Sequence, residues 1–330
     1  MAIITGTGGN DSTTGSSDSD TFYGLAGADY VHAYESIDTL YGGEGDDSLI
    51  GGIEGDFYSG DGGNDWLHGS ADNDSFFGGS GIDTIYYAQY TDGITVDLAA
   101  GTITSAGGQG FDRVDADIEA IIGSTVADTM WGSSRDDIFF GDAGDDLLVG
   151  RGGNDTLFGD ENAITTGGVD TIYGGAGTDT IYGGDAGDLI HFGADNTIGA
   201  GGAGYDYYYV SRSDGSNTIV DSSGSNELVL FGQFGTTSLF AAGTGVHDTS
   251  ALASPLSVGY VLGANGTSGG VNLSIVSGTA TLSFASDGGN VVFNTSQIQT
   301  ITLWDHDLTS GHTQEVYNWN GTTYAFAYYI

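Results

Sequence analysis

A nine-residue period runs through residues 6–209 and constrains the fold of this chain more than any other feature. Read in nines from Gly6, the sixth position is aspartate in nine consecutive repeats, and the eighth position is a bulky side chain in all but the first. A second block of repeats begins at Gly123 and keeps both positions. One such repeat buries too little to offset the entropy of ordering it, so the period predicts a solenoid of stacked repeats.

The charge of the chain is the second constraint. Its 330 residues include 45 Asp and Glu against four basic residues, which gives a formal charge of −41. Such an excess opposes compaction unless cations neutralise it, yet a content of 38% hydrophobic and 12% aromatic residues is too rich for a permanently disordered acidic chain. Bound metal is therefore expected to supply the missing positive charge.

The same composition argues against several classes of partner. The scarcity of basic residues disfavours binding to nucleic acid or to anionic membrane surfaces. The chain has no cysteine, so neither disulfides nor thiolate metal sites are expected. No apolar run reaches the length of about 18 residues that a transmembrane helix needs.

The aspartates at the sixth position are the candidate metal ligands. The second block has two departures: six extra residues within 159–170, expected to enlarge one loop, and Thr197 in place of aspartate, expected to leave one metal site weak or empty. The candidate ligands are Asp11, Asp20, Asp29, Asp38, Asp47, Asp56, Asp65, Asp74, Asp83, Asp128, Asp137, Asp146, Asp155, Asp170, Asp179, Asp188 and Asp206.

The repeat motif G-G-x-G-x-D-x-U-x, in which U is a large apolar residue, resembles the nonapeptide of the RTX (repeats-in-toxin), hemolysin-type calcium-binding family. The resemblance implies an all-β fold, a calcium-loaded parallel β-roll in which each nonapeptide gives a turn and a short strand and two nonapeptides make one coil. It also implies release from a bacterium in unfolded form, through a type I exporter that reads an uncleaved signal near the C-terminus. The N-terminal sequence, without a basic region followed by an apolar one, agrees with that route.

The chemistry of the turns fits calcium. Glycine tolerates positive φ and close backbone approach, so carbonyl oxygens can curl inward, and calcium prefers about 6 to 8 oxygen ligands at ~2.3 to 2.6 Å. Each ion is expected between turns 18 residues apart, as with Asp29 and Asp47, giving about thirteen ions and a charge near −15. The glycines expected to line these sites are Gly42, Gly43, Gly45, Gly60, Gly63, Gly78, Gly81, Gly141, Gly144, Gly150, Gly153, Gly174, Gly177 and Gly183.

The stretch between the two blocks has two interpretations. It spans 36 residues and keeps Ile94, Ile103 and Ile121 at eighth positions, but only Asp92 and Glu119 at sixth positions. We expect the coil to continue in phase here, without well-formed calcium sites. The alternative is a separate hairpin insertion around "GITVDLAAGTIT".

The chain divides into five predicted regions. Beyond the repeats the pattern alternates, with turn signals at residues 287–290 and 320–321, which predicts a compact β module, a small sandwich carrying the export signal. The regions are a first roll block (1–86), an in-phase degenerate segment (87–122), a second roll block (123–209), a cap and linker (210–255) and the C-terminal β module (256–330).

The C-terminal module offers weak catalytic signals. "GTSGG" at 266–270 fits a nucleophile motif but lacks the preceding buried strand and the following helix. Asp305, His306, Asp307 and His312 could bind a metal or act as acid and base, but a solvated loop is the expected reading. The aromatic residues of this region could stack on sugar rings or contact a neighbouring subunit, against the simpler reading of core packing; Tyr317 and Trp319 would share one strand face.

We therefore expect a secreted, non-enzymatic calcium-binding protein that folds on extracellular calcium and forms an extracellular assembly such as a surface layer or matrix. The alternative is a carbohydrate-binding or adhesive module, or an accessory to a secreted enzyme. The expected partners are Ca²⁺, further copies of the chain or an extracellular glycan, and the type I exporter.

Overall fold

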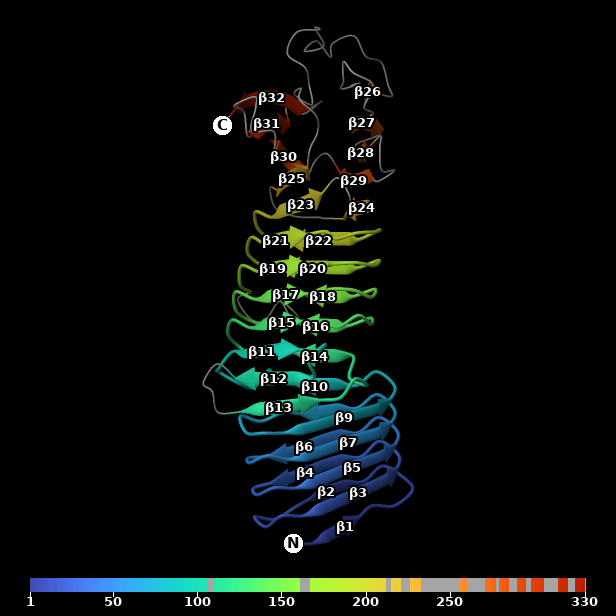
Figure 1. Ribbon diagram of the computed structural model, residues 1–330. Helices are drawn as coiled ribbons and strands as arrows, with labels where there is room; N and C mark the ends of the chain where they lie inside the picture. Colours follow the sequence, from blue (N-terminus) through green and yellow to red (C-terminus); the bar gives the residue numbers. More distant parts are fainter. Residues whose placement is uncertain are drawn as a thin grey trace. The chain divides into compact units, whose positions relative to one another are not determined.

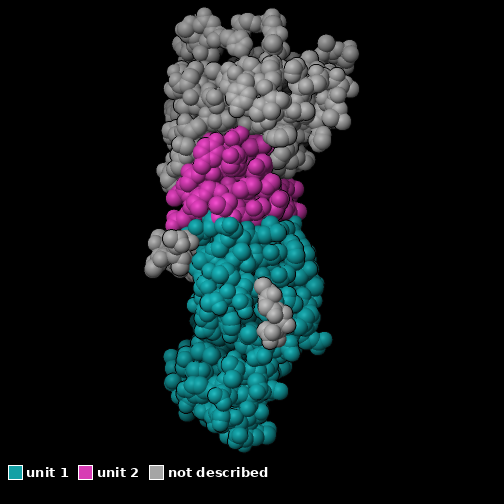
Figure 2. Space-filling view, turned by 90° about the vertical axis from the view of Figure 1, so that its left-hand side faces the viewer, with its two compact units in different colours: residues 1–152, 156–168 teal, residues 153–155, 169–330 magenta. Residues whose placement is uncertain are grey.

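The computed structural model describes residues 1–105, 110–160, 167–211, 215–220, 226–232, 256–259, 271–276, 279–284, 290–294, 298–305, 314–319 and 324–329. Within these residues every regular element is a β-strand (Figure 1). They form two compact units, coloured separately in Figure 2: residues 1–152 with 156–168, and residues 153–155 with 169–330. The predicted all-β parallel solenoid is confirmed within each unit.

The first unit consists of two sheets, between which the chain alternates once per repeat. Sheet A contains, in spatial order, β1 (Ile3–Thr5), β3 (Thr21–Ala26), β5 (Thr39–Glu44), β7 (Phe57–Gly62), β9 (Ser75–Ser80), β13 (Phe111–Val114), β12 (Thr102–Ser105), β11 (Ile94–Asp97), β15 (Thr129–Trp131) and β17 (Leu147–Val149). Sheet B contains β2 (Ser12–Thr14), β4 (Tyr30–Tyr34), β6 (Ser48–Gly52), β8 (Trp66–His68), β10 (Thr84–Tyr86), β14 (Ala120–Ile122), β16 (Ile138–Phe140) and β18 (Thr156–Phe158).

The register of the regular strands follows the repeat. Neighbouring strands in a sheet are parallel and pair residues 18 apart, as Leu40 with Tyr58 in sheet A and Leu49 with Leu67 in sheet B. Because side chains alternate across a strand, the eighth position points inward and the seventh and ninth point outward. Leu40, Leu49, Tyr58 and Leu67 are accordingly fully buried. The core is a set of ladders with one large side chain per repeat.

Residues 87–122 do not continue the regular coil, so the in-phase prediction is wrong. In sheet B, β14 pairs directly with β10, but in sheet A the strands β13, β12 and β11 lie between β9 and β15. Strand β12 is antiparallel to both of its neighbours. The chain reverses after β11 because a tight turn closes there, in which the Ala100 and Gly101 N–H groups donate to the Asp97 and Leu98 carbonyls. The alternative reading, a hairpin insertion, describes this segment.

The predicted apolar residues of the insertion remain buried: Ile94, Ile103 and Ile121 are at most 3% exposed. Ile121 keeps its place, pairing with Ile85. In β11 the register aligns Val96, rather than Ile94, with the core residue Met130.

The second unit begins with regular coils and ends in antiparallel strands. Sheet C contains β19 (Thr171–Tyr173), β21 (Leu189–His191), β23 (Tyr207–Ser211), β25 (Asn226–Gly232), β30 (Ile298–Asp305), β31 (Gln314–Trp319) and β32 (Tyr324–Tyr329). Sheet D contains β20 (Thr180–Gly184), β22 (Ile198–Gly202), β24 (Ser216–Ile219), β29 (Asn290–Asn294), β28 (Thr279–Phe284), β27 (Val271–Val276) and β26 (Leu256–Gly259). The C-terminal strands therefore extend both sheets of the coils, first in parallel and then in antiparallel pairs.

Candidate metal sites in the glycine turns

Repeat aspartates that lie 18 residues apart stack on one another in columns. One carboxylate oxygen of each accepts a hydrogen bond from the backbone of the preceding coil. The Asp29 N–H donates to Asp47 Oδ1 at 2.7 Å, and the Asp47 N–H donates to Asp65 Oδ1 at 2.8 Å. The same bond joins Asp38 to Asp56 and Asp170 to Asp188. These side chains are almost completely buried. The pairing of aspartates 18 residues apart is therefore present in both units.

The second carboxylate oxygen has no such donor in six of these turns. In the described residues, the Oδ2 atoms of the following aspartates are buried and accept no hydrogen bond: Asp29, Asp38, Asp47, Asp56, Asp65 and Asp83. A buried carboxylate oxygen without a donor is costly, because it loses its hydration and gains nothing in return. Because the same lack of a donor recurs in six turns, we expect a cation beside these oxygens.

A glycine at the first position, present in five of these six turns, keeps the space around this oxygen open. A Cβ added to Gly60 would collide with Asp65 Oδ2 in its own turn and would lie 2.6 Å from the Gly78 carbonyl oxygen of the next turn. A Cβ on Gly24 would likewise collide with the Gly42 carbonyl oxygen. Carboxylate and carbonyl oxygens thus converge from two stacked turns. An oxygen-only donor set of this kind suits Ca²⁺ better than zinc or copper.

The predicted glycines occupy the positions that this geometry needs. At the first position, beside the aspartate of their own turn, are Gly42, Gly60, Gly78, Gly141, Gly174 and Gly183. The predicted glycines that have left-handed backbone at the second or fourth position of a turn are Gly43, Gly45, Gly63, Gly81, Gly144, Gly153 and Gly177. The Gly150 carbonyl oxygen approaches Gly132 of the preceding turn.

The electrostatics of the columns also favour a cation. The pKa of Asp56 is raised to about 8, chiefly by burial and also by the neighbouring carboxylates of Asp74 and Asp38. Burial likewise raises the pKa of Asp65 to about 7 and that of Asp47 to about 6. Negative charge is therefore disfavoured in the turns as long as no positive charge lies beside it.

The columns end in uncharged residues, of which the period revealed Thr197 but not Asn217 and Asn226. Thr197 donates to Asp179 Oδ2 through its hydroxyl at 3.4 Å, and its own N–H donates to Asn217 Oδ1 at 3.0 Å. The Asp206 N–H donates to Asn226 Oδ1 at 3.0 Å. Each asparagine lies 20 residues after its partner, out of phase with the nonapeptide. Amide oxygens thus replace the carboxylates where the repeats stop.

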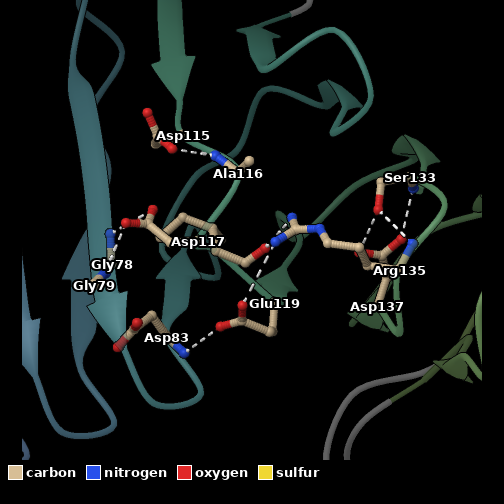
Figure 3. A network of polar contacts seen from close by, with 11 residues as sticks. Gly78, Gly79, Asp83, Asp115, Ala116, Asp117, Glu119, Ser133, Arg135 and Asp137 are labelled. Atoms are coloured by element: carbon tan, nitrogen blue, oxygen red, sulfur yellow. Dashed lines mark hydrogen bonds and ion pairs between the residues drawn. The ribbon is translucent and has the colours of Figure 1, made fainter.

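The insertion brings its own carboxylates into the columns, as Figure 3 shows for Asp117 and Glu119. Asp112, 38 residues after Asp74, accepts the Asp74 N–H at 2.9 Å. Glu119 accepts the Asp83 N–H at 3.2 Å and lies 3.8 Å from the Arg135 guanidinium, and Asp117 accepts from the Gly78 and Gly79 N–H groups. Sequence reasoning found Glu119 but missed Asp112, whose only signal is the D-x-V pattern at 112–114.

Several predicted features fall outside the described residues. These are residues 161–166 of the enlarged segment 159–170, the stretch 266–270, and His306, Asp307 and His312. Trp304, Tyr317, Trp319 and Asp305 lie in strands whose backbone pairing is described. Among the described residues, no helix is long and apolar enough to span a membrane.

The family model of the RTX calcium-binding nonapeptide repeat matches residues 5–35, 23–58, 50–85, 122–163 and 164–198. Residues 5–85 and 122–198 are therefore RTX calcium-binding nonapeptide repeats, and repeats of this family bind calcium. The comparison with curated proteins gives no match. Among solved structures, the chain is similar to the extracellular lipase LipA from Serratia marcescens, with 16% identity and a TM-score of 0.24 over 81% of this chain and 40% of the lipase. The chain thus spans less than half the length of that enzyme.

Replacement of Asp47 by asparagine is expected to lower calcium uptake. The amide oxygen can still accept the Asp29 N–H, but the charge beside two stacked turns is lost. Calcium titration should show two sites weakened by at least about tenfold, since charge-assisted contacts contribute about 1.5–3 kcal/mol. Asp46→Asn is the matched control, because Asp46 caps the Asn64 N–H at 2.8 Å, a task that an amide also performs. Equal calcium binding by the two variants would contradict the assignment of Asp47.

Proposed function

We propose that this protein is a secreted, non-enzymatic calcium-binding protein that folds on extracellular calcium and assembles into an extracellular structure. The observation that carries the proposal is the set of buried aspartate Oδ2 atoms without donors in stacked glycine turns. Calcium is scarce in the cytosol and plentiful outside the cell. A chain that needs the ion to compact would stay unfolded until it has passed a type I exporter, and would fold on arrival.

The outward faces of the sheets support the assembly. None of the residues at the seventh and ninth positions of the aspartate repeats is Asp, Glu, Arg or Lys, although the chain carries 45 acidic residues. Sheet A presents instead a ladder of Tyr23, Tyr41, Phe57 and Phe77, of which Tyr23 is 40% and Phe77 37% exposed. Contiguous exposed apolar surface marks interaction sites. Acidic turns and neutral sheet faces would direct copies of the chain to meet through their sheets.

The orientation of the rings favours a protein partner over a glycan. The Tyr23 and Tyr41 rings stack on each other, with centroids 5.1 Å apart and planes 2° apart. In the second unit, His191 stacks between Tyr173 and Tyr209 at 4.2 and 4.3 Å. Sugars stack on the faces of aromatic rings, and neighbouring rings already cover one face of Tyr23 and both faces of His191.

Sedimentation and electron microscopy with and without millimolar calcium test the assembly. The calcium-loaded protein is expected to form ordered particles or sheets, and the variant Tyr23→Ser with Tyr41→Ser is expected to bind calcium normally but to assemble less. A calcium-loaded protein that remains a monomer at all concentrations would contradict assembly. If that monomer co-sedimented with an insoluble polysaccharide, the carbohydrate-binding alternative would replace it.

A further inference from the structure

The aspartate-bearing turns that are described in full occur in two backbone forms. In the first, which we name open, the second and fourth residues both have left-handed φ, as Gly43 (114°) and Gly45 (122°) do. The form does not depend on glycine at the second position, since Leu25 (84°) adopts it together with Gly27 (111°). Tyr34 and Asp61 occupy second positions of open turns in the same way.

In the second form, which we name closed, the second residue is serine or threonine and neither the second nor the fourth residue is left-handed. The Ser70 N–H donates to Asp74 Oδ2 at 2.8 Å, and Ser70 Oγ accepts the Asp72 N–H at 3.2 Å. This is a serine turn, in which the hydroxyl takes over a backbone contact. Figure 3 shows the same arrangement at Ser133 and Asp137, where the N–H to Oδ2 distance is 2.6 Å.

The form of the turn decides whether the turn itself donates a hydrogen bond to Oδ2 of its aspartate. All six aspartates whose Oδ2 lacks a donor lie in open turns. In every closed turn, by contrast, the second residue donates its N–H to Oδ2; these pairs are Thr7 with Asp11, Ser16 with Asp20, Ser70 with Asp74, Ser124 with Asp128, and Ser133 with Asp137. A closed turn has therefore already satisfied the oxygen that an open turn offers to a cation.

Closed turns also occupy particular places in the fold. Thr7 and Ser16 lie in the first turn of each column, Ser70 lies in the turn before the insertion, and Ser124 and Ser133 lie in the turns after it. At each place one stacked glycine turn is missing. The turn of Ser124, for example, contacts the irregular segment at Tyr90, whose carbonyl oxygen accepts the Thr125 N–H. On the side of the missing turn, an ion would lack oxygens from a second glycine turn, whereas calcium needs about 6 to 8 oxygens in all.

We propose that the residue at the second position selects which turns take up calcium, so that serine and threonine turns close on themselves and end each ion column. This inference rests on the proposed calcium binding and sharpens it. Within residues 1–86, the aspartate pairs formed by two open turns are Asp29 with Asp47, Asp47 with Asp65, Asp65 with Asp83, and Asp38 with Asp56. These pairs bind calcium, and the pairs that include Asp11, Asp20 or Asp74 do not.

Two matched pairs of single variants in the full-length protein test the proposal, with bound calcium counted by native mass spectrometry and by equilibrium dialysis. Ser70→Gly is expected to free Asp74 and to add one ion per chain, and Ser70→Thr is expected to add none. Leu25→Ser is expected to close its turn and to remove the ion between Asp29 and Asp47. Leu25→Gly, which suits the left-handed backbone, is expected to keep that ion.

The outcomes separate this inference from the proposed function. If the wild-type chain binds no calcium, the proposed function falls. If it binds calcium but Ser70→Gly and Ser70→Thr bind the same number of ions, position two does not select the sites and the inference is overturned. Leu25 is half-exposed, so its variants are expected to fold. Should Leu25→Ser fail to fold, the count for folded Ser70→Gly still decides the question.

Discussion

Removal of calcium at neutral pH is expected to abolish most of the β-structure of the two roll blocks. The charge of −41 is then left without counterions, and the buried Oδ2 atoms of the open turns are left without any partner. The core offers little compensation, because each regular repeat buries only one large side chain, such as Leu49. Far-ultraviolet circular dichroism and sedimentation velocity should show a nearly complete change to an expanded chain, reversed by added calcium.

Other cations provide the control for this experiment. Monovalent salt at matched ionic strength screens long-range repulsion but cannot bring together carbonyl and carboxylate oxygens at a site. Magnesium demands tighter octahedral geometry and retains water. Both are therefore expected to restore much less structure than calcium does. Persistence of the full native β-signal after exhaustive metal removal, with no metal detected by mass spectrometry, would disprove the ionic basis of the fold.

The regular coils could be predicted from the sequence because two of nine positions carry the structural information. Aspartate at the sixth position and a large residue at the eighth fix both the register and the buried face, so Leu49 above Leu67 follows from counting alone. The same counting places Asp47 between Asp29 and Asp65. A solenoid makes such inference possible because each repeat contacts mainly its neighbours.

The insertion could not be predicted in this way, because its contacts depend on chain reversal rather than on the period. The turn at Asp97–Gly101 sends β12 antiparallel to β11, which no nonapeptide count reveals. Asp112 then joins the column two residues out of phase. Residues 87–122 therefore contribute three strands to sheet A but only β14 to sheet B.

The two forms of turn were also hidden in the sequence, although their residues are visible there. Ser70 and Gly79 both occupy second positions, and the period treats them alike. Only the backbone shows that Gly79 is left-handed while Ser70 donates to its own aspartate. The signal was the hydroxyl-bearing residue, whose preference for local backbone hydrogen bonds is general.

Acidification is expected to restore part of the β-structure of the calcium-free chain. Burial raises the pKa of Asp47 to about 6, of Asp65 to about 7 and of Asp56 to about 8 in the folded state, against an ordinary value near 3.9 in an unfolded chain. Folded turns therefore hold protons more tightly than unfolded ones. The resulting stability is fully present below about pH 4 and is lost as pH rises toward about 8. A proton thus replaces part of the effect of the ion.

Calcium affinity should follow the opposite course in the same range. An ion that binds beside these carboxylates must displace their protons. Calcium affinity should therefore fall by up to about tenfold for each unit by which the pH is lowered, for each proton displaced. Circular dichroism of protein freed of calcium by gel filtration, followed from pH 8 to pH 5, tests the first effect; calcium titration with measurement of released protons tests the second. Asp56→Asn should reduce both, since it removes the carboxyl with the highest of these pKa values. A calcium-free chain equally unfolded at both pH values, together with calcium affinity independent of pH, would show that the turns do not hold these protons.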